Sequence, residues 1–304
     1  MSDKTREDVE ILGVNHTLAI DPDSLNEAGV VWTPAVRALA SAVAPIVVAE
    51  AEARRSSSAF ASASSAVDSS TDRALTTRIL ELGAGTGALG IALACAVPDV
   101  RVTLTDLDRV VPLMRTNADA TRDAGKLARG SELRVAELAW SRDAVLGLDD
   151  APGGGGGDRR DGGARWDVVL GCEILYWGGW DVFADDTRGP LLEACVAACE
   201  AVEGAEGDAE GGAERVGGPS PPQTLVALAF TVRDKARESG YVAGDFGEKF
   251  WLRVLDGRDF GFGFGADVDE TDELRRMDAD ARARIEAAEE GDLLVLGAVA
   301  KRRK

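Results

Sequence analysis

The sequence predicts an α/β fold, in which a doubly wound and mostly parallel sheet carries helices on both faces. Short apolar runs alternate with helix-like runs along the chain, which is the pattern of strand–helix–strand units. A glycine-rich loop follows the first such strand, and ligands of these folds bind at the carboxyl ends of the strands. The 304 residues, 45% of them hydrophobic, are enough for one sizeable core.

The individual elements follow from this alternation. The expected strands are short, mostly apolar runs, and they cover residues 78–82, 100–105, 132–138, 166–171, 223–230, 259–264 and 293–300. The expected helices are longer runs, and they cover residues 87–96, which are rich in Ala and Leu, 108–126, 189–202 and 246–255. A long helical region is expected before the first strand.

Three low-complexity segments interrupt the pattern, at about residues 53–74, 151–164 and 203–222. The first consists mainly of Ala and Ser, the second contains five consecutive glycines, and the third is rich in Gly, Glu and Pro. Such composition buries too little apolar surface to offset the entropy of ordering it. We expect mobile loops inserted into a single domain that spans residues 1–304.

Composition and charge exclude several classes of function. The 34 Lys and Arg against 53 Asp and Glu give a net charge of −19, which disfavours nucleic-acid binding. The four cysteines have no C-x-x-C spacing, so no metal site is expected. The only histidine, His16, lies in a polar stretch and is expected on the surface, which makes a His-based triad unfavourable.

The first residues of the chain and its apolar runs indicate where in the cell the protein is expected. Residues 1–10 are charged and have no apolar core of a signal peptide, and the apolar run 36–48 is too short for a membrane span. We therefore expect a cytoplasmic monomer without membrane contact. The basic run 301–304 is compatible with a nuclear signal.

The glycine loop, residues 80–88 (LELGAGTGA), is the strongest candidate for a binding site. Glycines let the backbone turn sharply and approach a ligand, and the N–H groups of the following helix point toward it. Gly83, Gly85 and Ala88 also satisfy the dinucleotide fingerprint with Ala in third place. The loop alone therefore leaves both NAD and S-adenosylmethionine (SAM) open.

Two acidic residues near the loop help to choose between NAD and SAM as the cofactor. Asp106 ends the second strand, where a carboxylate can accept both ribose hydroxyls of an adenosine, which both cofactors contain. Glu81 lies two residues before Gly83, where it can face the cationic methionine end of SAM. The late start of the first strand also favours SAM, because NAD domains more often begin at that strand.

Residues 81–87 (ELGAGTG) resemble motif I of the seven-strand, class I SAM-dependent methyltransferases. Four further segments resemble the protein-lysine methyltransferase branch that carries the D-x-x-Y motif. They are residues 29–32 (GVVW), 102–106 (VTLTD) with Asn117 in the next helix, 137–140 (ELAW) and 170–176 (LGCEILY). The resemblance implies a seven-stranded Rossmann-like sheet, SAM as cofactor, and methyl transfer to a lysine of a non-histone protein.

The resemblance also implies a role for individual residues. It assigns the cofactor to Trp32, Glu81, Gly83, Ala84, Gly85, Gly87, Asp106, Trp140 and Cys172. Among these, Trp32 would close the methionine side, Trp140 would flank the adenine, and Cys172 would lie against the cofactor. Glu173 and Tyr176 would face the methyl-transfer channel as catalytic residues, Glu173 to capture and orient the amine and Tyr176 to form a hydrogen bond.

One position departs from the branch, because Glu173 stands where the motif usually has Asp. Glutamate keeps the charge but reaches one methylene further. A protein-histidine methyltransferase, a small-molecule methyltransferase and a catalytically silent SAM-binding protein therefore remain alternatives, beside a nicotinamide-dependent dehydrogenase.

Overall fold

The computed structural model describes residues 5–22, 29–62, 76–148, 166–175, 187–200, 224–255 and 271–301. The sequence interpretations for 151–164, 203–222, 259–264 and Tyr176 lie outside these residues. The strands are β1 (Thr5–Ile11), β2 (Val14–Ile20), β3 (Thr77–Leu82), β4 (Val100–Asp106), β5 (Glu132–Glu137), β6 (Val168–Cys172), β7 (Leu225–Thr231), β8 (Phe250–Val254) and β9 (Leu293–Ala300). The helices are α1 (Thr33–Ser62), α3 (Ala88–Ala96), α4 (Val111–Asp123), α5 (Arg142–Gly147), α6 (Arg188–Cys199), α7 (Lys235–Ser239), the π-helix η1 (Gly240–Phe246), α8 (Gly247–Lys249) and α9 (Asp272–Ala287).

Seven strands form one sheet in the order β5-β4-β3-β6-β7-β9-β8. The first five pair in parallel, and β9 runs antiparallel to both of its neighbours. The chain first builds outward from β3 to β5 and then outward from β6 in the other direction. This reversal places a crevice at the carboxyl ends of β3 and β6, where doubly wound sheets bind ligands. The expected fold class is confirmed.

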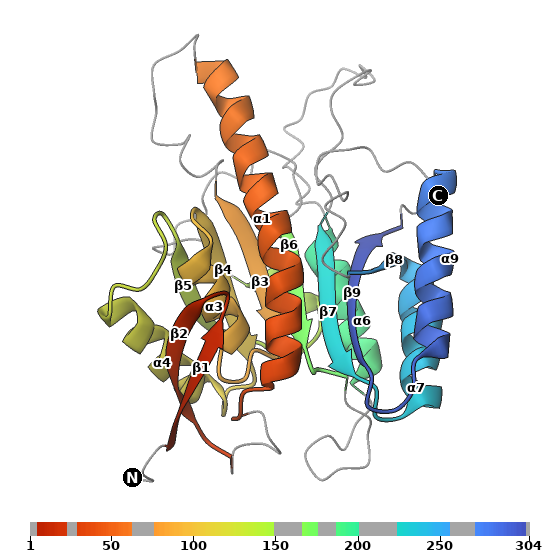
Figure 1. Cartoon of the computed structure of the whole chain (residues 1–304), viewed down its shortest axis with the longest axis horizontal. Helices are drawn as coiled ribbons and strands as arrows, with labels where there is room; N and C mark the ends of the chain where they lie inside the picture. The colour runs from red at the N-terminus through yellow and green to blue at the C-terminus, as the bar shows by residue number, and fades with distance from the viewer. Residues whose placement is uncertain are drawn as a thin grey trace.

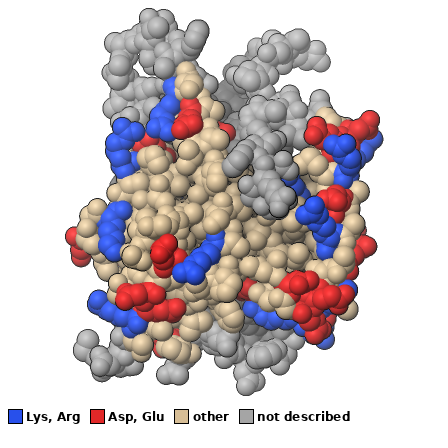
Figure 2. All heavy atoms as spheres, viewed as in Figure 1, with Lys and Arg blue, Asp and Glu red and all other residues tan. Residues whose placement is uncertain are grey.

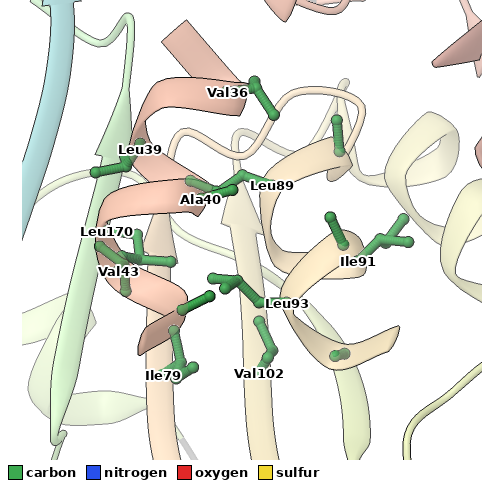
Figure 3. Close-up of a cluster of buried hydrophobic side chains, with 14 of the residues drawn as sticks. Val36, Leu39, Ala40, Val43, Ile79, Leu89, Ile91, Leu93, Val102 and Leu170 are labelled. Atoms are coloured by element: carbon green, nitrogen blue, oxygen red, sulfur yellow. The ribbon is translucent and has the colours of Figure 1, made fainter. Parts of the chain in front are cut away.

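Helices cover both faces of the sheet (Figure 1). On one face, α1 and α3 pack on the central strands, because apolar residues recur at helical spacing along α1 and the short helix α3 is apolar throughout. Figure 3 shows this cluster, with side chains of both helices pointing at the sheet. It includes Val36, Leu39, Ala40, Val43, Ile79, Leu89, Ile91, Leu93, Val102 and Leu170. The other face packs against α6, η1 and α9.

Helix α1 extends further than the sequence analysis expected. It includes residues 53–62, which were assigned to a mobile insertion, because Ala has the best helix propensity and the run continues the helix. Its stretch Thr33–Ser56 is also long and apolar enough to cross a membrane by length and composition alone, contrary to the expectation from residues 36–48. In this structure half of that stretch is buried in the protein.

The exposed side of the α1 face carries few charges. Figure 2 shows most Lys, Arg, Asp and Glu toward the rim of this face, with one acidic and basic patch nearer its middle among other residues. Near its C-terminal half, α1 is tied to the sheet through Arg54, whose Nη2 donates to Asp167 Oδ1 at 2.6 Å. Asp167 is buried and also accepts the backbone N–H of Arg78 at 2.6 Å, so one carboxylate joins α1 to the start of β3.

The long helical region expected before the first core strand is α1, and the residues that precede it form a hairpin that the sequence analysis did not expect. Strands β1 and β2 pair antiparallel, and the turn between them has Leu12 and Gly13 at φ +52° and +74°. Two consecutive positive φ angles match the tight turn that suits the twist of a hairpin. Because alternate residues face inward, His16 is buried rather than exposed, and burial lowers its pKa.

The segment 246–255 is the second correction. Phe246 ends the π-helix η1, Gly247–Lys249 forms the short helix α8, and Phe250–Val254 forms strand β8 beside β9. The sequence FWLRV is aromatic and branched, as edge strands often are, but the strand exists only because β9 lies next to it. Helix α9 was not among the expected helices.

Candidate functional site

The glycine loop lies between β3 and α3 at the carboxyl edge of the sheet. Gly83, Gly85 and Gly87 have φ angles of +64°, +56° and +79°, which side chains rarely adopt. A Cβ at Gly83 would lie 2.9 Å from Ile174 Cγ2 and 3.2 Å from Trp140 Cζ2. The loop is therefore a backbone cradle with Trp140 on one side and the residues after β6 on the other.

Asp106 joins this cradle to the end of β4. Its Oδ2 accepts the N–H of Gly85 at 2.7 Å, and its Oδ1 accepts the N–H of Leu107 at 2.8 Å. The residue is buried, and burial raises the pKa of its carboxyl although both N–H groups act against that shift. Each oxygen keeps a further lone pair, so the position assigned to ribose binding retains its capacity to accept hydroxyls.

Glu81 lies behind the cradle. Its Oε2 accepts the N–H of Gly90, in the first turn of α3, at 2.9 Å. Burial raises the pKa of Glu81 to about 8, and the nearby Asp106 adds to the shift. The carboxyl thus supports the start of the helix and is largely protonated at neutral pH. Its proposed contact with the methionine end of SAM stays a prediction.

Glu173, the departure from the D-x-x-Y motif, is fully engaged in hydrogen bonds. Its Oε1 accepts the Thr231 hydroxyl at 2.6 Å and the Thr231 N–H at 3.0 Å, and its Oε2 accepts Arg233 Nη2 at 2.5 Å. The residue is buried and its backbone has φ +55°, which is uncommon for any residue other than glycine. Such strain persists where the surroundings over-determine it, which is frequent at functional sites.

Arg233 also contacts the N-terminal side of the site. Its guanidinium carbon lies 5.4 Å from the ring centroid of Trp32, within cation–π range. The indole Nε1 of Trp32 is buried and has no hydrogen-bond acceptor among the described residues. Trp32 directly precedes α1, and Figure 1 shows the start of that helix at the edge where β3 and β7 end.

Cys172 ends β6, next to Glu173. Burial, followed by the charges of Glu173 and Glu81, raises the pKa of its thiol well above the ordinary value. The side chain is therefore a neutral thiol and not a nucleophile. The structure places Cys172 at the carboxyl end of β6, near the carboxyls of Glu173 and Glu81.

Two site features were missed or undervalued by sequence reasoning. Arg233 and Thr231 lie at the carboxyl end of β7, and the sequence signal was their position directly after an apolar strand. Asn117 was noted only for its resemblance. Its Oδ1 accepts the N–H of Ala19 at 2.7 Å, and its Nδ2 donates to the carbonyls of Ala19 and Thr86, each at 3.0 Å. It thereby joins the hairpin to the glycine loop.

The residues present fit an adenosine cofactor with a charged amino-acid end. The cradle leaves no room for a Cβ, Asp106 can accept ribose hydroxyls, and the buried Trp32 N–H has no described acceptor. Among the described residues, no group of three His, Cys, Asp or Glu could hold a metal ion. The fold and site are thus a seven-stranded, Rossmann-like sheet with a glycine cradle suited to an adenosine cofactor.

Comparison with known sequences specifies the branch. Residues 15–149 match the family model described as lysine methyltransferase. This match agrees with the resemblance drawn from the motifs, and it covers the segment that contains the glycine loop and Asp106. The family also indicates SAM as the cofactor, in agreement with the residues at the cradle.

Individual proteins resemble the chain over a short segment or at low sequence identity. The chain is 32% identical over 99 residues to protein N-lysine methyltransferase METTL21A of Danio rerio, a match that covers 33% of this chain and 37% of that protein. An O-methyltransferase structure from Agrobacterium tumefaciens shares 14% identity with a TM-score of 0.38, covering 75% of each chain. The structure of PKMT2 from Rickettsia typhi in complex with AdoHcy shares 14% identity with a TM-score of 0.30, covering 55% of this chain and 23% of that one.

Proposed function

We propose that this chain is a SAM-dependent protein methyltransferase that transfers methyl groups to a lysine side chain of a non-histone protein. The observation that carries the proposal is the glycine cradle bound to Asp106, within a segment that matches the lysine methyltransferase family. The site lies at the reversal of strand order, where this fold binds its ligand.

SAM, when bound, would supply a methyl group on a sulfonium: the acceptor nitrogen would bond to the methyl carbon in line as the S–C bond breaks, which would leave a neutral thioether. The protein mainly has to position the two partners, because the donor is already reactive. Gly83, Ala84 and Gly85 would hold the methionine moiety through their backbone, and Asp106 would hold the ribose. Trp140, beside Gly83, would flank the adenine, and the neutral thiol of Cys172 would pack against the cofactor without competing as a nucleophile.

The acceptor side is formed by the residues after β6. A lysine must lose its proton before transfer, since its ordinary pKa is about 10.4 and only about one molecule in a few thousand is neutral at pH 7. Desolvation at the site would favour the neutral amine. Tyr176 is proposed to hydrogen-bond the amine there.

The contacts of Glu173 favour an indirect role. An amine approaching its carboxylate would have to compete with Thr231 and Arg233, which already donate to both oxygens. We therefore propose that Glu173 orients the acceptor end mainly as a positioning residue, by fixing Arg233 and the strained backbone after β6.

A transfer assay tests the proposal. Purified protein and lysate are incubated with SAM carrying a labelled methyl group, and labelled peptides are sequenced by mass spectrometry. We expect label on lysine with the wild type and none with Asp106→Ala. Label on histidine or on a small molecule would contradict the lysine assignment. Binding of SAM with no labelled product would indicate a catalytically silent protein.

A further inference from the structure

We propose that Arg233, with the indole N–H of Trp32, binds the α-carboxylate at the methionine end of SAM. The inference rests on the proposed function, because it concerns the same cofactor site. It assigns a cofactor contact to a residue at the end of β7 that the sequence motifs do not include.

The guanidinium of Arg233 is held in a fixed place. Its backbone N–H donates to Glu238 Oε2 at 2.7 Å, and its Nη2 donates to Glu173 Oε2 at 2.5 Å. Trp32 lies against its face at 5.4 Å. A guanidinium has five N–H donors, of which the described contacts use one. The side chain is 38% exposed while that of Glu173 is 1% exposed, so part of the cation faces away from its partner.

Trp32 supplies a second donor beside it. A buried N–H without an acceptor costs about 1–3 kcal/mol, so native proteins rarely leave one unpaired. Among the described residues nothing accepts the Nε1–H of Trp32. An indole N–H next to a partly free guanidinium forms a pair of donors, and an anion of carboxylate size would satisfy both.

A cofactor whose ribose lies at Asp106 would have its methionine end near Arg233 and Trp32. Asp106 marks the ribose end on β4, and the strand order continues from β4 through β3 and β6 to β7. The amino-acid end therefore extends over Gly83 toward the residues after β6. Ile174 lies against the Gly83 position, and Glu173, one residue earlier, holds Arg233. The carboxylate of the cofactor needs a cation at that end, and Arg233 provides it.

The test compares two ligands by calorimetry. S-adenosylhomocysteine (SAH) has the amino-acid end, whereas 5′-methylthioadenosine has the adenosine and thioether but no carboxylate. Arg233→Ala is expected to weaken SAH binding by about 10- to 100-fold, the worth of a charged hydrogen bond, and to change binding of 5′-methylthioadenosine by less than about twofold. Trp32→Phe, which keeps an aromatic ring but removes the indole N–H, is expected to show a smaller loss for SAH alone.

Arg233→Ala leaves the buried carboxylate of Glu173 without its cation, which could itself disturb the site. The double variant Arg233→Ala with Glu173→Gln removes that unpaired negative charge and repeats the comparison of the two ligands. Arg237→Ala is the matched control, since Arg237 is an exposed arginine four residues further along that pairs with Asp234. An equal loss for both ligands, or no loss for either, would overturn the assignment. A wild type that binds neither ligand would instead overturn the proposed function, and this inference with it.

Discussion

Asp106 fixes the glycine loop by accepting the N–H of Gly85, and we propose that its remaining lone pairs accept the hydroxyls of a ribose. Asp106→Ala removes both, so we expect SAH affinity to fall by about 100-fold, the combined worth of more than one charged hydrogen bond. Calorimetry measures the change. Asp108→Ala, an exposed carboxylate two residues further along, is the control and should leave affinity unchanged. Retention of full affinity by Asp106→Ala would refute the ribose assignment.

A variant of Glu173 separates a role in positioning the acceptor from a role in binding the cofactor. Glu173→Gln keeps the size of the side chain but removes the negative charge opposite Arg233. We expect the free energy of unfolding to fall by about 1–3 kcal/mol, as for other hydrogen bonds to charged groups. We also expect SAH binding to persist while methyl transfer is lost. Thermal unfolding, calorimetry and the transfer assay measure these three effects, and full turnover would show that Glu173 has no role in transfer.

At the scale of elements, the link between β3 and α3 depends on pH. The pKa of Glu81 is raised to about 8 in the folded protein, above its ordinary value of 4.5. The folded state therefore binds more protons, and this contribution to stability is fully present below pH 4.5 and lost as pH rises through about 8. Glu81→Gln cannot ionise. Relative to the wild type, its melting temperature should increase between pH 6 and pH 9; a difference that is constant with pH would contradict the burial argument.

The hairpin is the other element that depends on one side chain. Asn117 is buried in α4 and forms three hydrogen bonds, two to Ala19 and one to Thr86. Asn117→Ala should lower the free energy of unfolding by about 1–3 kcal/mol and speed amide hydrogen exchange in β2. Exchange measured by mass spectrometry tests this, with the exposed Asn15→Ala as the control. Unchanged exchange in β2 would show that packing alone holds the hairpin.

For the whole molecule, the parallel core was predictable because each strand is a short apolar run followed by a helix or a turn. Strands β3, β4, β5, β6, β7 and β9 lie within two or three residues of their expected bounds at each end. The glycine loop and Asp106 were predictable because the loop directly follows one of these strands and Asp106 ends the next, so both are found from the sequence of a short segment. The combination of motifs then indicated the class of protein.

The remaining features depend on contacts that a local pattern does not contain. The hairpin needs two positive φ angles at Leu12 and Gly13, and β8 needs β9 as its neighbour. Arg233 becomes part of the site only because β6 and β7 end side by side, which brings it to Glu173 over 60 residues of sequence. Such pairings are tertiary, so they override single-segment propensity.

The central claim is that this molecule binds SAM at the carboxyl ends of β3 and β4. Calorimetric titration of the purified protein with SAM, SAH and NAD tests it most directly. The account predicts saturable heat with SAM and SAH at one site per chain, and none with NAD. Binding of NAD in place of SAM, or binding of none of the three ligands, would contradict it.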